Sequence, residues 1–104
     1  MVRSLGQAQV TVGDEDVRVA ELRTAVSRLR RRLAALPADF PDRVVAEEEL
    51  ADLAAMTAHG VPEISRLHRS LLLIAGAIGS VSALSPGLAE VRRAVELFGD
   101  PPRR

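Results

Sequence analysis

Apolar positions recur along most of the chain in steps that alternate between three and four residues. The first stripe has steps of 3, 4, 3, 4 and 3, and it consists of Val19, Leu22, Val26, Leu29, Leu33 and Leu36. This spacing places the side chains on one face of an α-helix and is typical of helices that pack against other helices. Asp14, Glu15 and Asp16 are candidate N-caps, and Pro37 disfavours helical geometry at the residue before it. We predict a helix from about residue 16 to residue 36.

A second stripe follows in residues 42–58. Its steps are 4, 3 and 4, and it consists of Ala46, Leu50, Leu53 and Thr57. Asp42 is the candidate N-cap of this second helix. At the other end, Gly60 is expected to adopt a left-handed conformation, Val61 to fold back onto the helix, and Pro62 to block its continuation.

The third stripe begins near Glu63 and runs into an uncharged part of the chain. Its steps are 3, 4, 3, 4 and 3, and it consists of Ile64, Leu67, Leu71, Ile74, Ile78 and Val81. Ser85 and Pro86 then have the order of an N-cap and a first helical residue. The fourth stripe consists of Leu88, Val91, Val95 and Phe98. Pro86 either separates two helices, with the reversal of the chain that we favour, or kinks one long helix.

Four amphipathic stripes without a competing strand pattern predict an all-α fold. Because the first two helices are joined only by PADFPD, we expect an antiparallel helical hairpin. This hairpin packs on a third long helix, and a short fourth helix or a kinked continuation completes a helical bundle with coiled-coil-like packing. The expected domain is residues 14–99, preceded by a flexible N-terminal arm (1–13) and followed by a disordered tail (100–104).

The hairpin accounts for two blocks of charge. It places the basic end of the first helix beside the acidic start of the second, and the two blocks are Arg28, Arg30, Arg31 and Arg32, and Glu47, Glu48, Glu49 and Asp52. We expect the blocks to pair within the chain. The alternative is that these arginines, perhaps with Arg23, bind nucleic acid. We expect no nucleic-acid partner, because 14 arginines are balanced by 14 acidic residues and only two residues are aromatic.

The composition of the chain excludes several kinds of catalytic and metal-binding site. A chain of 104 residues forms one domain, and its apolar fraction of 47% predicts a core of Leu, Val, Ile and Ala. Cysteine is absent, which excludes disulfides, thiolate catalysis and Cys-ligated metals. His59 and His68 have no second ligand at helical spacing, so we expect no enzyme activity, no cofactor and no metal site. The N-terminal residues lack the apolar core of a signal peptide, so we expect a cytoplasmic location.

The uncharged run from Ser70 to Ala89 is long enough to span a bilayer. A membrane-associated protein with residues 70–89 inserted is therefore an alternative. However, the stripe of apolar residues at helical spacing begins at Ile64, before the uncharged run. The chain also has no Trp or Tyr, the residues that favour a membrane interface. We therefore expect a helix packed among protein elements and no membrane partner.

The same stretch has a second face opposite its core stripe, which consists of Leu72, Leu73, Gly76, Gly79, Ser80 and Ala83. A helix that is apolar on both sides must be covered on both sides. A glycine inside a helix costs about 1 kcal/mol relative to alanine, so these glycines indicate the close approach of another backbone. The cover is either the fourth helix, folded back, or a second copy of the chain. We expect a homo-oligomer, with a dimer as the first candidate, or an unidentified protein partner.

Two strings of the sequence resemble small all-helical proteins of unknown function from actinobacteria. They are LRTAVSRLRRRLAALPADFPDRVVAEEELADLAAM and PEISRLHRSLLLIAGAIGSVSALSPGLAEVRRAVELFG, and the likeness covers about residues 16–99. The chain is similar more loosely to Ala-, Leu- and Arg-rich helical modules of bacterial defence and signalling proteins. The resemblance implies an all-α interaction module and supplies no catalytic, cofactor-binding or metal-binding residue.

Overall fold

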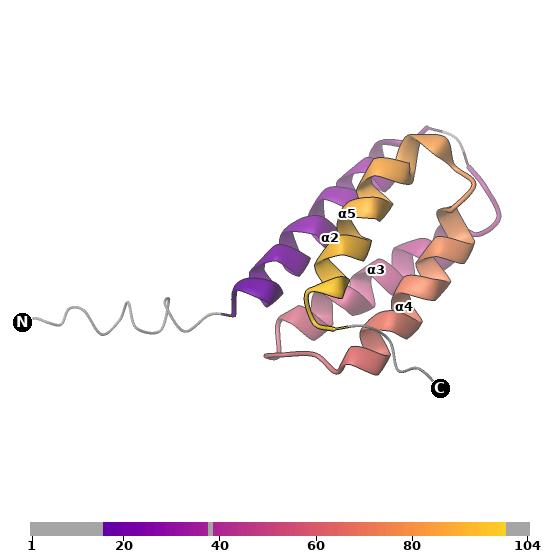
Figure 1. The fold of residues 1–104 in the computed structure, drawn as a ribbon. Helices are drawn as coiled ribbons and strands as arrows, with labels where there is room; N and C mark the ends of the chain where they lie inside the picture. Colours follow the sequence, from indigo (N-terminus) through magenta and orange to yellow (C-terminus); the bar gives the residue numbers. More distant parts are fainter. Residues whose placement is uncertain (1–15, 38, 100–104) are drawn as a thin grey trace, which may run out of the picture.

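The computed structural model describes residues 16–37 and 39–99, which form four α-helices and one 3₁₀ helix (Figure 1). In chain order the elements are α2 (Val17–Ala35), α3 (Arg43–Thr57), α4 (Ile64–Ile78), η1 (Ser82–Leu84) and α5 (Ser85–Glu96). The chain runs up, down, up and down, so each α-helix is antiparallel to the next. The predicted all-α bundle is confirmed. The predicted arm (1–13) and tail (100–104) lie outside the described residues.

The four α-helices form a ring in which each packs against two others. Both α2 and α4 pack against α3 and α5, so α2 and α4 lie diagonally across the bundle. The largest fully buried side chains are Leu22, Leu29, Leu33, Leu50, Leu53, Leu67, Ile74, Ile78, Leu84, Val26, Val91 and Val95. All of them except Leu84 belong to the four predicted stripes. The stripes therefore define the core.

The turn between α4 and α5 lies earlier than predicted. The sequence predicts a third helix that reaches Val81 and a break at Ser85 and Pro86, but α4 ends at Ile78. The backbone is extended at Val81, with φ −93° and ψ 101°, and the chain then reverses. This early reversal carries Leu84 into the core, where it is buried. Ser85 is therefore the first residue of α5 instead of its cap, and Pro86 follows it in the first turn, where a backbone N–H is not needed.

Left-handed glycines follow two of the helices. Gly60 after α3 has a φ of 102° and Gly99 after α5 has a φ of 120°, conformations that glycine adopts at little cost. The predicted left-handed conformation of Gly60 is confirmed, whereas Val61, which was expected to fold back onto the helix, remains 59% exposed. Asp42 occupies the N-cap position of α3, but its side chain makes no capping hydrogen bond. Its ψ of 11° departs from the extended backbone that directs a capping side chain to the helix N–H groups.

Arg43 joins the end of α2 to the start of α3. Its guanidinium donates hydrogen bonds to the carbonyl oxygens of Leu33 (2.6 Å) and Leu36 (3.0 Å). It also pairs with Glu47 one turn further along α3, at 3.2 Å. Carbonyl groups in the last turn of a helix have no partner within the helix, and the helix dipole favours a cation there. Arg43 therefore closes the hairpin of α2 and α3.

The start of α2 is linked to the end of α5 by Asp16, Arg18 and Phe98. Asp16 is the N-cap, because its Oδ1 accepts a hydrogen bond from the Arg18 backbone N–H (2.9 Å). The Arg18 guanidinium donates to both carboxylate oxygens, at 3.0 and 2.7 Å, and this bonding lowers the pKa of Asp16 from its ordinary value of 3.8 to about 2. The guanidinium carbon of Arg18 also lies 4.9 Å from the centre of the Phe98 ring, in a cation–π contact.

The first turn of α5 approaches α2 closely at Gly87, which is buried. A methyl group at this position would lie 2.9 Å from Leu29 Cδ1 and 3.5 Å from Arg32 Cδ. Leu29 is fully buried, so it has little space into which to move. Gly76 in α4 provides a contrast, because nothing lies within 4 Å of the same methyl group there.

Replacing each of these two glycines by alanine should change the free energy of unfolding in opposite directions. Gly87→Ala should lower it by about 1–3 kcal/mol, the usual cost of overpacking a core. Gly76→Ala should raise it by about 1 kcal/mol, since alanine is the better helix former. Urea denaturation followed by circular dichroism, at a protein concentration low enough to avoid association, measures both changes. A stabilising Gly87→Ala would contradict the close packing of α5 on α2.

Asp16→Ala should lower stability in a pH-dependent way. Because the folded-state pKa of Asp16 is about 2 and its ordinary value is 3.8, the ionised carboxylate stabilises the fold above that ordinary value. This contribution is lost as the pH falls through the folded-state pKa. Urea denaturation of the variant and the unmodified chain should therefore differ near neutral pH and converge as the pH approaches 2. A difference that stays constant over this range would show that the charge of Asp16 contributes nothing.

Candidate functional site

Helix α4 has one buried face and one exposed face. Its buried residues are Leu67, Ser70, Leu71, Ile74 and Ile78. On the opposite side, Leu72 is 73% exposed and Leu73 is 44% exposed. Gly76 follows one turn later and faces open space. Burial of apolar surface is favourable by about 25 cal/mol per Å², so the two leucines would gain stability from a cover that the described residues do not provide.

All six residues of the predicted second face are exposed, and they are Leu72, Leu73, Gly76, Gly79, Ser80 and Ala83. We call this set the α4 face. The sequence left two possible covers, and the fourth helix is the wrong one, because α5 packs against α2 and α4 without covering these residues. The physical reason is the early turn after Ile78 together with the close fit of Gly87 on α2.

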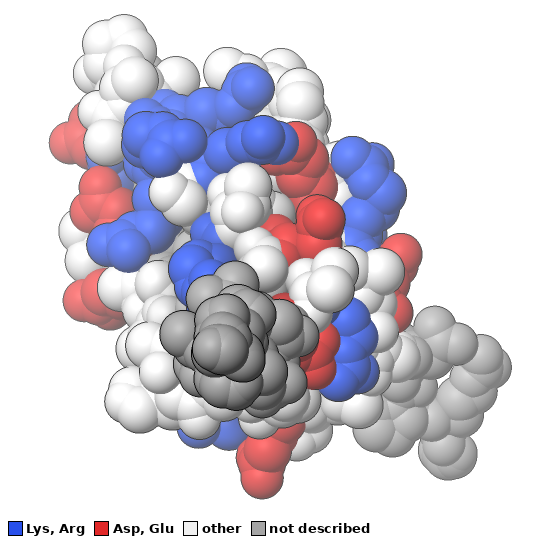
Figure 2. All heavy atoms as spheres, turned by 90° about the vertical axis from the view of Figure 1, so that its left-hand side faces the viewer, with Lys and Arg blue, Asp and Glu red and all other residues white. Residues whose placement is uncertain are grey.

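The α4 face also differs from the other side of the bundle in charge. Between Arg69 and Glu90 the chain has no ionisable side chain. Figure 2 views the molecule from the side of α2, where basic and acidic side chains are interspersed over the surface. The outer side of α4 is therefore apolar over the part of the helix that follows Arg69.

Val45 of α3 is a further exposed apolar residue. It is 40% exposed, and it lies 7 and 11 residues before Asp52 and Met56, which places the three residues on one side of α3. Asp52 and Met56 line a hollow together with Arg66 of α4, so this side of α3 adjoins α4.

The basic cluster of α2 is paired differently from the prediction. The predicted partners of Arg28, Arg30, Arg31 and Arg32 are Glu47, Glu48, Glu49 and Asp52. Instead, Arg28 pairs with Glu90 of α5 at 3.0 Å, and Arg31 donates to Ser27 Oγ at 3.0 Å. The predicted pairing of the two blocks is wrong, because α5 also packs against α2 and supplies a carboxylate beside Arg28, while Glu47 pairs with Arg43 in its own helix.

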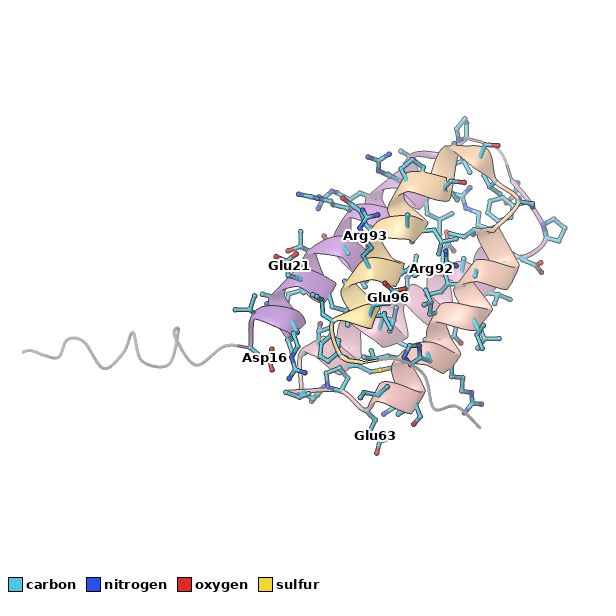
Figure 3. The ribbon with its side chains drawn as sticks, viewed as in Figure 1. Asp16, Glu21, Glu63, Arg92, Arg93 and Glu96 are labelled. Atoms are coloured by element: carbon cyan, nitrogen blue, oxygen red, sulfur yellow. The ribbon has the colours of Figure 1, made fainter. Side chains whose placement is uncertain are left out.

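Hollows lie on both sides of α2, and two of them are the larger ones. The one between α2 and α5 has a volume of about 460 Å³ and contains charges of both signs, including Glu21 and Arg93. Figure 3 shows these two residues where α2 and α5 meet, whereas Arg92 and Glu96 lie on α5 nearer α4. The hollow between α2 and α3, of about 590 Å³, is lined by Arg23, Val26, Ser27, Arg30, Arg31, Ala34, Ala54, Thr57 and Ala58. No histidine lines either hollow, so neither pairs a hydroxyl with an imidazole base.

Both histidines lie against backbone carbonyl oxygens. His59 Nδ1 is 2.7 Å from the oxygen of Ala55 at the end of α3. His68 Nε2 is 3.2 Å from the oxygen of Gly99 and links α4 to the end of α5. The tautomer that these contacts favour carries a proton on Nδ1 of His59 and on Nε2 of His68. Each of these N–H groups donates a hydrogen bond to its carbonyl oxygen. Across residues 16–37 and 39–99, no group of three or more His, Cys, Asp or Glu side chains could hold a metal ion.

The uncharged run of residues 70–89 does not form one helix. It is divided among the end of α4, the turn, η1 and the start of α5. In the part of the chain that the structure describes, every helix is too short or too polar to cross a bilayer. The apolar residues of the run are instead shared between the core and the α4 face.

Comparison with known proteins gives one match. The model of a family of unknown function, DUF5955, matches residues 11–99, which include all four described α-helices and the whole α4 face. No curated protein and no solved structure matches the chain. Since the matched region covers most of the sequence, the chain belongs to the DUF5955 family.

Proposed function

We propose that the protein is a non-enzymatic helical interaction module that self-associates through the α4 face, with a dimer as the simplest assembly. The observation that supports this most directly is the exposure of Leu72 and Leu73 on a helix whose other side is fully packed. Contiguous exposed apolar surface marks interaction sites on soluble proteins. The leucines lie on a regular helix, so the surface is available without rearrangement of the fold.

A second copy of the chain fits this surface better than an unrelated protein. The α4 face has large side chains at one end, Leu72 and Leu73, and small residues at the other. A two-fold axis brings the same patch of two copies together, so the leucines of one copy can contact the small residues of the other. Docking of a different protein is the alternative use of the same face, and a monomeric mass for the purified chain would favour it.

The proposal assigns the protein no catalytic role and no cofactor. It is supported by the lack of cysteine in all 104 residues and by the backbone contacts of both histidines. We also propose a cytoplasmic location, which the lack of cysteine supports because small secreted domains commonly depend on disulfides.

Nucleic-acid binding through the arginines of α2 is the second candidate function. In its favour, Arg30 and Arg32 are exposed and make no ion pair within the described residues. However, single-stranded nucleic acids are usually bound with aromatic side chains on which the bases stack. The only aromatic residues of the chain, Phe40 and Phe98, pack against the core and are not free to do so.

Self-association should be lost in Leu72→Glu, because the substitution places a charge within the proposed contact, at its most exposed leucine. Val17→Glu is the matched control: Val17 is 71% exposed, close to the 73% of Leu72, but it lies on α2, diagonally across the bundle. Size exclusion coupled to light scattering at micromolar concentration should give a dimer for the unmodified chain and for Val17→Glu, and a monomer for Leu72→Glu. Circular dichroism checks that all three are equally helical. A monomeric unmodified chain would refute the proposal.

The protein should not retard labelled single-stranded or duplex DNA or RNA in a gel at low salt. We expect no retardation because acidic and basic residues are equal in number and no aromatic side chain is free to stack on a base. Electrostatic contacts alone give only weak binding that salt removes. Retardation that disappears in Arg30→Glu/Arg32→Glu would instead establish the second candidate function.

A further inference from the structure

We infer that the hollow between α2 and α3 is a binding site for an anionic amphiphile, a small molecule with a carboxylate or phosphate head and an apolar body. The volume of this α2–α3 hollow, about 590 Å³, lies within the range of about 300–1,000 Å³ that small-molecule sites occupy. None of its lining residues belongs to the α4 face. The inference therefore goes beyond the proposed self-association and does not depend on it.

Every charged side chain that lines the α2–α3 hollow is basic, and these side chains are Arg23, Arg30 and Arg31 of α2. The hollow between α2 and α5 differs, because it also contains carboxylates and its Arg28 is paired with Glu90. An anion in the α2–α3 hollow would meet guanidinium groups and no lining carboxylate. Guanidinium groups bind carboxylate and phosphate oxygens through pairs of parallel hydrogen bonds. The lining charge therefore selects an anionic head.

Two of these arginines have no carboxylate partner among the described residues. Arg30 is exposed and makes neither an ion pair nor a hydrogen bond there. Arg31 donates one hydrogen bond, at 3.0 Å, to the hydroxyl oxygen of Ser27, which also lines the hollow. That bond holds the Arg31 guanidinium beside the hollow, and its remaining N–H groups can donate to a ligand. At the other end, Arg23 donates to the carbonyl oxygen of Thr57 at 3.4 Å and links the two walls.

The rest of the lining favours an apolar body. Val26, which is fully buried, lines the hollow together with Ala34, Ala54 and Ala58. Alanine side chains fill little of the space between two helices, so the hollow stays open. An apolar body would remove these side chains from water, which is favourable, whereas a simple anion would leave them exposed. The sugar–phosphate backbone of a nucleic acid offers no such body.

A smaller neighbouring hollow indicates how the ligand is oriented. It shares Arg30 and Ala34 with the α2–α3 hollow and is also lined by Glu47. The Glu47 carboxylate is paired with Arg43 at 3.2 Å, and it would repel an anionic head placed next to it. The head is therefore expected between Arg30 and Arg31 on the side of Ser27, with the apolar body extending away from Glu47.

Titration of the isotope-labelled full chain with decanoate, followed by backbone amide chemical shifts, tests the site. Decanoate is an anionic amphiphile, and it is used below the concentration at which it forms micelles. It should cause saturable shifts at Ser27, Ala34 and Ala54, which line the hollow. Acetate has the charge without the apolar body, and decyltrimethylammonium has an apolar body with the opposite charge. Neither of these two probes should cause saturable shifts there.

Arg30→Gln should weaken the binding of decanoate about tenfold, because it removes charge-assisted hydrogen bonds to the head. Arg32→Gln is the matched control, since Arg32 is also exposed on α2 but does not line the hollow. Ala34→Trp should fill one end of the hollow and weaken binding by a similar factor. Ala35→Trp, at the exposed neighbouring residue outside the hollow, should not. Circular dichroism checks that all four variants are as helical as the unmodified chain.

Saturable binding that Arg30→Gln and Ala34→Trp weaken, and their controls do not, would support the inference. Equally tight binding of decyltrimethylammonium, or equal weakening by Arg30→Gln and Arg32→Gln, would overturn it. Shifts confined to Leu72 and Leu73 would place the probe on the α4 face and would also contradict it, as would the lack of any saturable shift. A monomeric mass for the chain would refute the proposed self-association alone, because the titration does not require a dimer.

Discussion

The bundle depends on the contact between its first and last described helices, α2 and α5. The other contacts between α-helices join neighbours in sequence, whereas this one brings together Leu29 and Gly87 from distant parts of the chain. It encloses the side of α2 that α3 does not cover, so that Leu22 and Leu29 are fully buried. The same contact directs α5 away from the outer side of α4. Closure of the core and exposure of the α4 face therefore have one cause.

The core could be predicted from periodicity because each stripe records which side of a helix is buried. The four stripes include every one of the largest fully buried residues except Leu84. Leu84 was missed because periodicity does not show where a helix ends when the next apolar residues continue its rhythm. Val81 keeps the step of three from Ile78, yet the chain leaves the helix between them, since burial of Leu84 stabilises the earlier turn.

The candidate site could be predicted in part. The register of LLLIAGAIGSVSAL separates a core side from an outer side, and all six residues assigned to the outer side are exposed. The pairing of Arg28 with Glu90 could not be foreseen, because it requires knowledge that α5 returns to α2.

The contacts of Arg18 with Phe98 and of His68 with Gly99 hold both ends of the described chain at the same end of the bundle. Each α-helix has two neighbours in the ring. The same ring could therefore be formed by a chain in which a different helix comes first. A circular permutant that joined residue 99 to residue 16 through a short linker and opened at Gly60 would keep every contact between helices. The packing of the four α-helices therefore does not depend on which of them comes first in the chain.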